Sequence, residues 1–206
     1  MNAAPKTTDL ENGAPEKWEA LLDPDLLRGK LISASIYIAA YELLAESIIG
    51  HIKGFFFDGI NPDGPVTSPA YAEEVLSRNR SPLYASLDWL RENDVIDDAD
   101  LAAFETIKKC RNELAHEMLA LASGFTDGQY LEQLPVIAAL IKKIETWWVV
   151  NFEIPVNPDF DNVEIDETGI VPGPCMALQL LVDIALGEPN KAKWYLEEFR
   201  RRRQRA

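Results

Sequence analysis

The chain has 206 residues, of which 47% are hydrophobic and 26% charged, and its formal net charge at pH 7 is −14. This length and apolar content suit one folded domain, with room for a small appended unit. The acidic balance argues against a dedicated non-specific nucleic-acid binder, because such a protein presents a basic surface to the phosphates.

The first part of the chain is expected to lead from a disordered arm into a long apolar helix. Residues 1–16 show no hydrophobic periodicity and predict the arm, and a short helix over 17–27 follows. The next helix should run from Leu26 to about Phe56. It is apolar enough that a membrane span must be considered. Glu42 and Glu46 stand one turn apart within it, and two carboxylates oppose burial in hydrocarbon, so we favour a buried helix of a soluble bundle.

Turn and cap signals organise the segment that follows. His51 falls in the last turn of the long helix, where a histidine usually only complements the negative end of the helix dipole. Residues 58–69 are rich in Gly, Pro and Asn and predict a loop. Ser68–Pro69 and Ser81–Pro82 each predict a helix start, since Ser caps well and Pro suits the first turn. The second of these helices should end near Asn93.

A longer helix is predicted from about Asp98 to about Ser123, with Asp97 or Asp98 as its cap. Arg111 projects to within about 40° of the centre of its apolar face. A permanent charge in that position needs an ionic partner or a phosphate. The apolar residues that recur at the three- and four-residue spacing of one helix face are Leu101, Phe104, Ile107, Leu114, Met118 and Leu121.

The C-terminal third is expected to hold one more bundle helix and a helical hairpin. A helix from about Gln129 to about Phe152 has a wide apolar face. Residues 151–173 combine prolines with a run of acidic residues and predict an extended connector, with one short strand around 163–165 as an option. The acidic residues that stand out are Asp159, Asp161, Glu164, Asp166 and Glu167. These carboxylates lack the spacing of an EF-hand loop. Two helices, at 175–186 and 189–202, should follow.

The charge of the C-terminal end differs from that of the rest. Removing the five positive charges of Arg200–Arg203 and Arg205 from the net charge of −14 leaves −19. This basic tail could contact RNA locally, fold back on the acidic body, or contact a second subunit. Cys110 and Cys175 lie far apart without metal-ligand spacing, so a reduced cytoplasmic protein is the simplest interpretation, with one disulfide as the alternative.

The segment Arg111-Asn112-Glu113-Leu114-Ala115-His116 resembles the signature of the HEPN superfamily, an Arg followed by a polar residue and then a His. The resemblance implies a small all-α bundle that is usually a dimer. Many such proteins are metal-independent endoribonucleases that act as toxins or in anti-phage defence. By this resemblance, His116 would be the general acid and base, Arg111 the phosphate clamp and Asn112 a positioning donor, without any cofactor.

Helix geometry bears on how such a site would assemble. Arg111 and His116 lie about 140° apart around one helix, so they converge most easily in the cleft of a homodimer. RNA would be the substrate, and an antitoxin or a regulatory protein would be a further partner. Glu113 and Glu117 flank His116 and would repel RNA phosphates, which is the main physical argument against catalysis.

A non-catalytic interpretation stands beside the enzymatic one. In it, Glu113 pairs with Lys109 and His116 along the helix, and Arg111 is neutralised by Glu42 or Glu46. The protein would then be a module for dimerisation or regulation, similar to the mannitol-repressor family. Side chains of Arg111 and His116 that lie apart in salt bridges would remove most of the support for catalysis.

In either case we expect an all-α protein with three parts. These are the arm at 1–16, a four-helix HEPN-like bundle at 17–152, and the acidic connector with the C-terminal hairpin and basic tail at 153–206. No nucleotide-binding loop and no internal repeat accompany them. Any chemistry therefore rests on Arg111, Asn112 and His116.

Overall fold

The computed structural model describes residues 19, 22–122, 129–161 and 163–204, without the side chains of 116–122, 129 and 189. The arm predicted at 1–16 and most of the short helix predicted at 17–27 lie outside the described residues. The described chain is mostly helical, as predicted, with one small β-hairpin.

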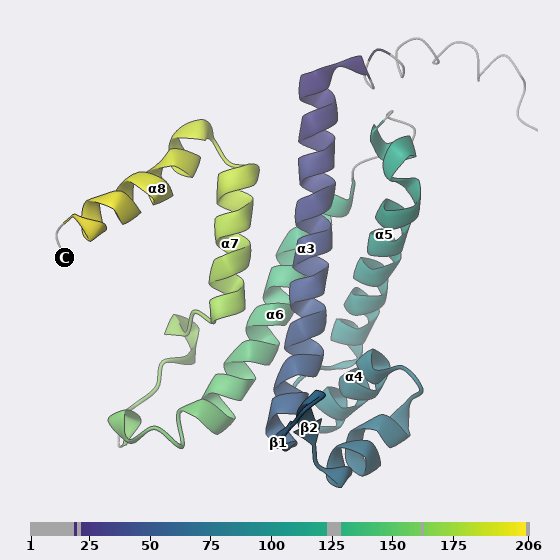
Figure 1. The fold of residues 1–206 in the computed structure, drawn as a ribbon, viewed down its shortest axis with the longest axis vertical. Helices are drawn as coiled ribbons and strands as arrows, with labels where there is room; N and C mark the ends of the chain where they lie inside the picture. Colours follow the sequence, from purple (N-terminus) through teal and green to yellow (C-terminus); the bar gives the residue numbers. More distant parts are fainter. Residues whose placement is uncertain (1–18, 20–21, 123–128, 162, 205–206) are drawn as a thin grey trace, which may run out of the picture.

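The long helix α3 (Pro24–Phe55) runs through the middle of the fold (Figure 1). It begins at Asp23, whose side chain accepts hydrogen bonds from the backbone N–H groups of Asp25 and Leu26. Pro24 falls within the short helix predicted over 17–27, but it occupies the first turn of α3, where a missing N–H costs nothing. Helices α4, α5, α6 and α7 all contact α3.

Length and composition would allow α3 to cross a membrane, and it is the one helix of the described residues with that property. Within the fold, however, 44% of its most apolar 18-residue window is buried. Ala34, Tyr37, Ala40 and Leu44 are fully buried along it. The apolar character of α3 is thus used for packing against the other helices.

The loop predicted over 58–69 is largely a β-hairpin. Strands β1 (Phe57–Asn61) and β2 (Gly64–Thr67) pair antiparallel, with Asn61 opposite Gly64. The residues that predicted a loop make the tight turn, because Gly64 has φ 126° and the Asn61 side chain accepts a hydrogen bond from the Asp63 N–H at 2.9 Å. The turn signals were recognised, but the short strands on either side of them were not.

The next helices start and end where the cap signals predicted. A π-helical turn η1 (Tyr71–Val75) and a 3₁₀ turn η2 (Leu76–Arg78) lead to α4 (Pro82–Glu92), whose C-cap is Asn93. Helix α5 (Asp98–Ala122) follows. At its start, Asp97 Oδ1 accepts from the Asp100 N–H at 2.9 Å, and Asp100 Oδ2 accepts from the Asp97 N–H at 3.0 Å. This reciprocal arrangement is a capping box.

The last bundle helix, α6 (Leu134–Trp148), is preceded by a 3₁₀ turn, η3 (Gln129–Gln133), and followed by a π-helical turn, η4 (Val149–Glu153). The connector then contains the 3₁₀ turns η5 (Pro158–Phe160) and η6 (Glu167–Gly169). The strand considered at 163–165 was wrong, because this segment has no strand to pair with and the Asp166 side chain caps η6 instead.

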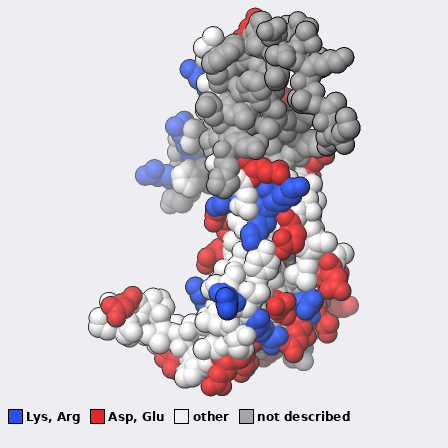
Figure 2. Space-filling model, turned by 90° about the vertical axis from the view of Figure 1, so that its right-hand side faces the viewer, with Lys and Arg blue, Asp and Glu red and all other residues white. Residues whose placement is uncertain are grey.

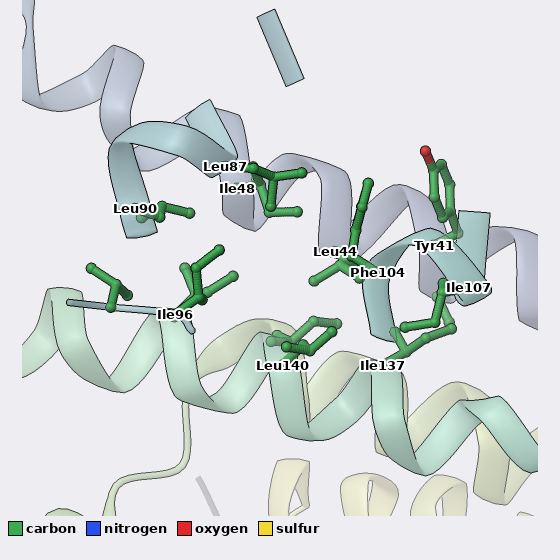
Figure 3. Packing of buried hydrophobic residues seen from close by; sticks show 14 of the residues in the cluster. Tyr41, Leu44, Ile48, Leu87, Leu90, Ile96, Phe104, Ile107, Ile137 and Leu140 are labelled. Atoms are coloured by element: carbon green, nitrogen blue, oxygen red, sulfur yellow. The ribbon is translucent and has the colours of Figure 1, made fainter. Parts of the chain in front are cut away.

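The predicted C-terminal hairpin consists of α7 (Gly173–Ala185) and α8 (Pro189–Arg203). Helix α7 packs on α3 and α6, whereas α8 contacts α7 and leads away from the bundle (Figure 1). The core lies between α3, α4, α5 and α6, where Leu44, Phe104, Ile137 and Leu140 point toward one another (Figure 3). Cys110 and Cys175 are both free thiols.

Candidate functional site

The middle of α5 carries the motif residues and is fixed by its own apolar face. Phe104, Ile107 and Leu114 are buried in the core. Because Arg111 lies four residues after Ile107 and three before Leu114, it must face the same direction, toward α3. The helix therefore brings a guanidinium to the edge of the core.

Arg111 finds its partner on α3. Its Nη2 donates to Glu42 Oε1 at 3.0 Å, and the guanidinium carbon lies 5.4 Å from the centre of the Tyr41 ring. The Arg111 side chain is 34% exposed, while its Nε is buried and has no hydrogen-bond partner in the described part of the chain. The prediction that this charge needs a partner is confirmed, and Glu42 rather than Glu46 provides it.

The residues beside Arg111 are engaged in packing or in surface pairs. Lys108 Nζ donates to the Tyr84 hydroxyl on α4 at 2.8 Å, and this bond raises the pKa of Lys108. Lys109 and Glu113 form the expected pair along the helix, at 3.9 Å. Asn112 is exposed on the outer side of α5. The motif thus presents a salt-bridged surface on one side and a packed one on the other.

His116 continues α5 as backbone, but its side chain lies outside the described residues. The same holds for the predicted contact between Glu113 and His116. The structure consequently brings Arg111 to Glu42 and Tyr41, and the predicted convergence of Arg111 with His116 stays a prediction.

The surface on the α5 side of the molecule carries charges of both signs. Figure 2 shows basic and acidic side chains interspersed there, with uncharged areas between them. Lys109 beside Glu113 and Arg111 beside Glu42 are examples of this alternation. The described part of this surface therefore offers no continuous basic track for an RNA backbone.

A second polar pair, between α3 and α6, was not predicted. His51 Nε2 lies 2.9 Å from Glu145 Oε2, and the imidazole stacks on the Trp148 ring with centroids 5.4 Å apart. Glu145 is buried. The sequence does contain a signal for this pair. Glu145 lies four residues after Ile141 and three before Trp148, so it falls on the apolar face of its helix, where a carboxylate needs a partner.

Each member of this pair changes the pKa of the other. The hydrogen bond to Glu145 raises the pKa of His51 above its ordinary value, although burial works against it. Burial alone would raise the pKa of Glu145, but the contact with His51 and the nearby Ser47 hydroxyl outweigh it, so the pKa is lowered. Both shifts favour the ion pair.

Aromatic rings surround the pair and form what we call the aromatic cluster. Trp148 lies at its centre, with ring centroids 4.7 Å from Phe152 and 6.0 Å from Trp89, the latter nearly parallel. Phe55, at the end of α3, contacts the same rings and is half exposed. The cluster joins α3, α4 and α6 at one end of the bundle and holds the His51 ring in place. Its members are Phe55, Trp89, Trp147, Trp148 and Phe152.

A cleft near these residues lies between α6 and η6 and has a volume of about 720 Å³. Lys142 and Lys143 contribute its positive charges, but Lys143 is bound by Asp97 and Asp100. The described residues contain no group of three or more His, Cys, Asp or Glu side chains placed to hold a metal ion. The cleft therefore offers no concentrated charge for an anionic substrate.

Comparison with known proteins finds no matching family model, no matching curated protein and no matching solved structure. The HEPN resemblance accordingly rests on the segment from Arg111 to His116 and on the helical frame around it.

Proposed function

We propose that this protein is a non-catalytic, HEPN-like module for dimerisation or regulation, and that it works as a homodimer in the cytoplasm. The observation that supports this most strongly is the 3.0 Å ion pair between Arg111 and Glu42. In this role the Arg of the motif ties α5 to α3 and leaves no free positive charge for a phosphate.

The electrostatics of the pair support a structural role. A phosphate that approached the Arg111 guanidinium would place its negative charge close to the Glu42 carboxylate. The Tyr41 ring further restricts the guanidinium to its present position, through a cation–π contact. Binding a phosphate would require that Arg111 share or leave a partner it already has.

We expect Arg111 and Glu42 to be energetically coupled in folding. The pair is partly exposed to solvent, at 34% and 56% of the two side chains, so screening limits its value. Arg111→Gln and Glu42→Gln, combined in a double-mutant cycle, should show a coupling of about 0.5 kcal/mol in the free energy of unfolding. Urea denaturation of the four proteins measures this quantity.

Glu46, one turn further along α3, supplies the matched control. Glu46→Gln paired with Arg111→Gln should be additive, because Arg111 contacts Glu42. Equal coupling to both glutamates, or none to either, would argue against the structural role of Arg111.

A metal-independent endoribonuclease with a composite site at the dimer interface is the second candidate. It is favoured by one observation: Glu42 and Tyr41 hold the guanidinium in a fixed place while a third of the Arg111 side chain stays exposed. A preorganised donor of this kind suits a developing negative charge. In that case RNA would be the substrate, and an antitoxin would be a plausible partner class.

The cytoplasmic location is part of the proposal. It is supported by the packing of α3, because the helix that could cross a membrane by length and composition is surrounded by α4, α5, α6 and α7. It is also consistent with the free thiols of Cys110 and Cys175.

A further inference from the structure

The junction between α7 and α8 is held by a specific polar network. The Asp183 carboxylate is buried and accepts hydrogen bonds from Lys191 Nζ at 2.7 Å, from the Tyr195 hydroxyl at 2.6 Å and from Gln179 Nε2 at 2.9 Å. These contacts lower the pKa of Asp183, with the bond from Lys191 as the largest cause. Four polar groups thus fix the angle between the helices, so α8 leaves α7 in a defined direction (Figure 1).

Beyond this junction the two helices diverge and leave apolar side chains exposed between them. Phe199 lies one turn after Tyr195 on the same side of α8, and Met176 lies two turns before Asp183 on the same side of α7. Phe199 is 64% exposed and Met176 is 54% exposed. We call the apolar surface that these two side chains expose the α7–α8 surface. Other large apolar side chains exposed on these helices are Leu181, Ile184, Trp194 and Leu196.

The end of α8 adds unpaired positive charge to this apolar surface. Arg201 and Arg202 pair with Glu198 on the same helix. Within the part of the chain that the structure describes, Arg200 and Arg203 form no ion pair and are exposed. Helix α8 therefore ends in free cations, although the chain as a whole is strongly acidic.

The negative charge that would complement these arginines lies at the other end of α7. The connector just before α7 exposes Asp159, Asp161, Glu164 and Glu167. It also exposes apolar side chains, including Val171 at 69%. A mixed acidic and apolar surface is the complement of a helix that carries phenylalanine, leucine and arginine.

We propose that the α7–α8 surface is the homodimer interface, and that α8 of a second copy covers it. This inference rests on the proposed homodimer and assigns its surface. The lengths match, because α7 and α8 span about 20 and 22 Å at 1.5 Å per residue. With α8 of the second copy antiparallel to α7, its apolar residues cover Met176 and its arginines reach the acidic connector. Two-fold symmetry makes the same contact twice.

A second copy explains these features better than a polyanion does. The rest of the chain carries −19 once the C-terminal arginines are removed, and this charge repels nucleic acid and anionic lipid alike. The acidic connector of a second copy attracts the same arginines, and the exposed apolar side chains require an apolar surface rather than phosphates.

Sedimentation equilibrium of the full chain over a range of concentrations tests the interface. The wild type should have twice the mass of one chain, and its dissociation constant should rise with salt. Phe199→Glu on α8 and Met176→Glu on α7 should each raise that constant at least about tenfold. Ile60→Glu is the matched control, since Ile60 is 80% exposed on β1, away from the α7–α8 surface. Circular dichroism checks that each variant is folded.

A charge swap sharpens the test. Arg200→Glu with Arg203→Glu should give a monomer, and so should Asp161→Arg with Glu164→Arg. Mixing the two variants should restore a dimer, because one of its two contacts is then the native pairing of arginines with the acidic connector and the other is the same pairing with the charges exchanged.

The possible failures are distinct. A wild-type monomer at every concentration overturns both this interface and the homodimer. A dimer that tolerates Phe199→Glu and Met176→Glu overturns the interface and leaves the homodimer standing. The variant with Arg200→Glu and Arg203→Glu is also tested for retention on RNA and on vesicles of phosphatidylserine and phosphatidylcholine. If this variant keeps the mass of a dimer but is no longer retained where the wild type is, α8 binds a polyanion and the inference is wrong.

Discussion

Replacing Trp148 with alanine should lower the free energy of unfolding by about 4 kcal/mol. Trp148 is only 4% exposed and lies at the centre of the aromatic cluster, against rings from α3, α4 and η4. Truncation would remove its own burial and leave a cavity that Trp89 and Phe152 cannot fill without losing other contacts. Urea denaturation measures this effect. It should be followed by circular dichroism at 222 nm, because the substitution removes a tryptophan and so changes the fluorescence signal itself.

Trp148→Phe is the matched control for this prediction. The indole Nε1 of Trp148 is buried and has no hydrogen-bond partner among the described residues. Phenylalanine therefore removes no hydrogen bond and keeps most of the ring contacts, so we expect a loss of only about 1 kcal/mol. A similar loss in the alanine and phenylalanine variants would show that the cluster is not packed as the structure has it.

The second large effect is expected at His51. Removing the imidazole leaves the buried Glu145 carboxylate without its main partner, which costs several kcal/mol when both groups are fully buried. Because the His51 side chain is 33% exposed, we expect a smaller loss, of about 2 kcal/mol, for His51→Ala at pH 5.5. His51→Phe should retain the stacking on Trp148 and still lose most of this energy.

The stabilisation by this pair should depend on pH in a defined direction. The folded pKa of His51 is raised, so its contribution is complete below the ordinary value of 6.5 and is lost as pH rises through the raised pKa. The folded pKa of Glu145 is lowered, so its contribution is complete above the ordinary value of 4.5 and is lost as pH falls through the lowered pKa. The pair should stabilise most between these two pH values.

Unfolding measurements at pH 5.5 and 8.5 test this dependence. The difference in the free energy of unfolding between wild type and His51→Phe should be larger at pH 5.5 than at pH 8.5. Glu145→Gln keeps a hydrogen-bonding group beside His51 but removes the negative charge. In that background, the stability lost on replacing His51 with Phe should therefore be nearly the same at pH 5.5 and pH 8.5. A gap between wild type and His51→Phe that widens toward pH 8.5 would contradict the proposed ion pair.

The helices could be predicted from sequence because their signals are local. Ser81–Pro82 and Asn93 define α4, and the aspartates at 97 and 100 fix the start of α5. The position of Arg111 on the core side of α5 followed from the spacing of its neighbours. Its partner could be narrowed to Glu42 or Glu46, because both lie on the same face of α3, but the choice between them depends on how the two helices cross.

The features that were missed depend on contacts between distant parts of the chain. His51 and Glu145 are 94 residues apart, so the cap-like position of His51 in α3 gave no sign of its partner. The hairpin of β1 and β2 is short and mostly exposed, so it lacks the apolar alternation that predicts a strand. The exposed face of α8 was visible as a basic tail, but its separation from the bundle depends on the hydrogen bonds to Asp183.

These features lie in different parts of the molecule and have different roles. The aromatic cluster and the pair of His51 with Glu145 stabilise one end of the bundle. Arg111 and Glu42 tie α5 to α3 on one side of it. The α7–α8 surface exposes apolar and basic side chains, and we propose that it contacts a second copy of the chain.

Digestion of RNA in EDTA most directly tests whether the motif is structural rather than catalytic. The purified full chain would be compared with Arg111→Ala and His116→Ala variants, prepared in the same way. With Arg111 held by Glu42, we expect no cleavage above background that depends on either residue, and the same background in all three samples. Cleavage by the wild type that is abolished in both variants would contradict the structural role and establish the motif as a ribonuclease site.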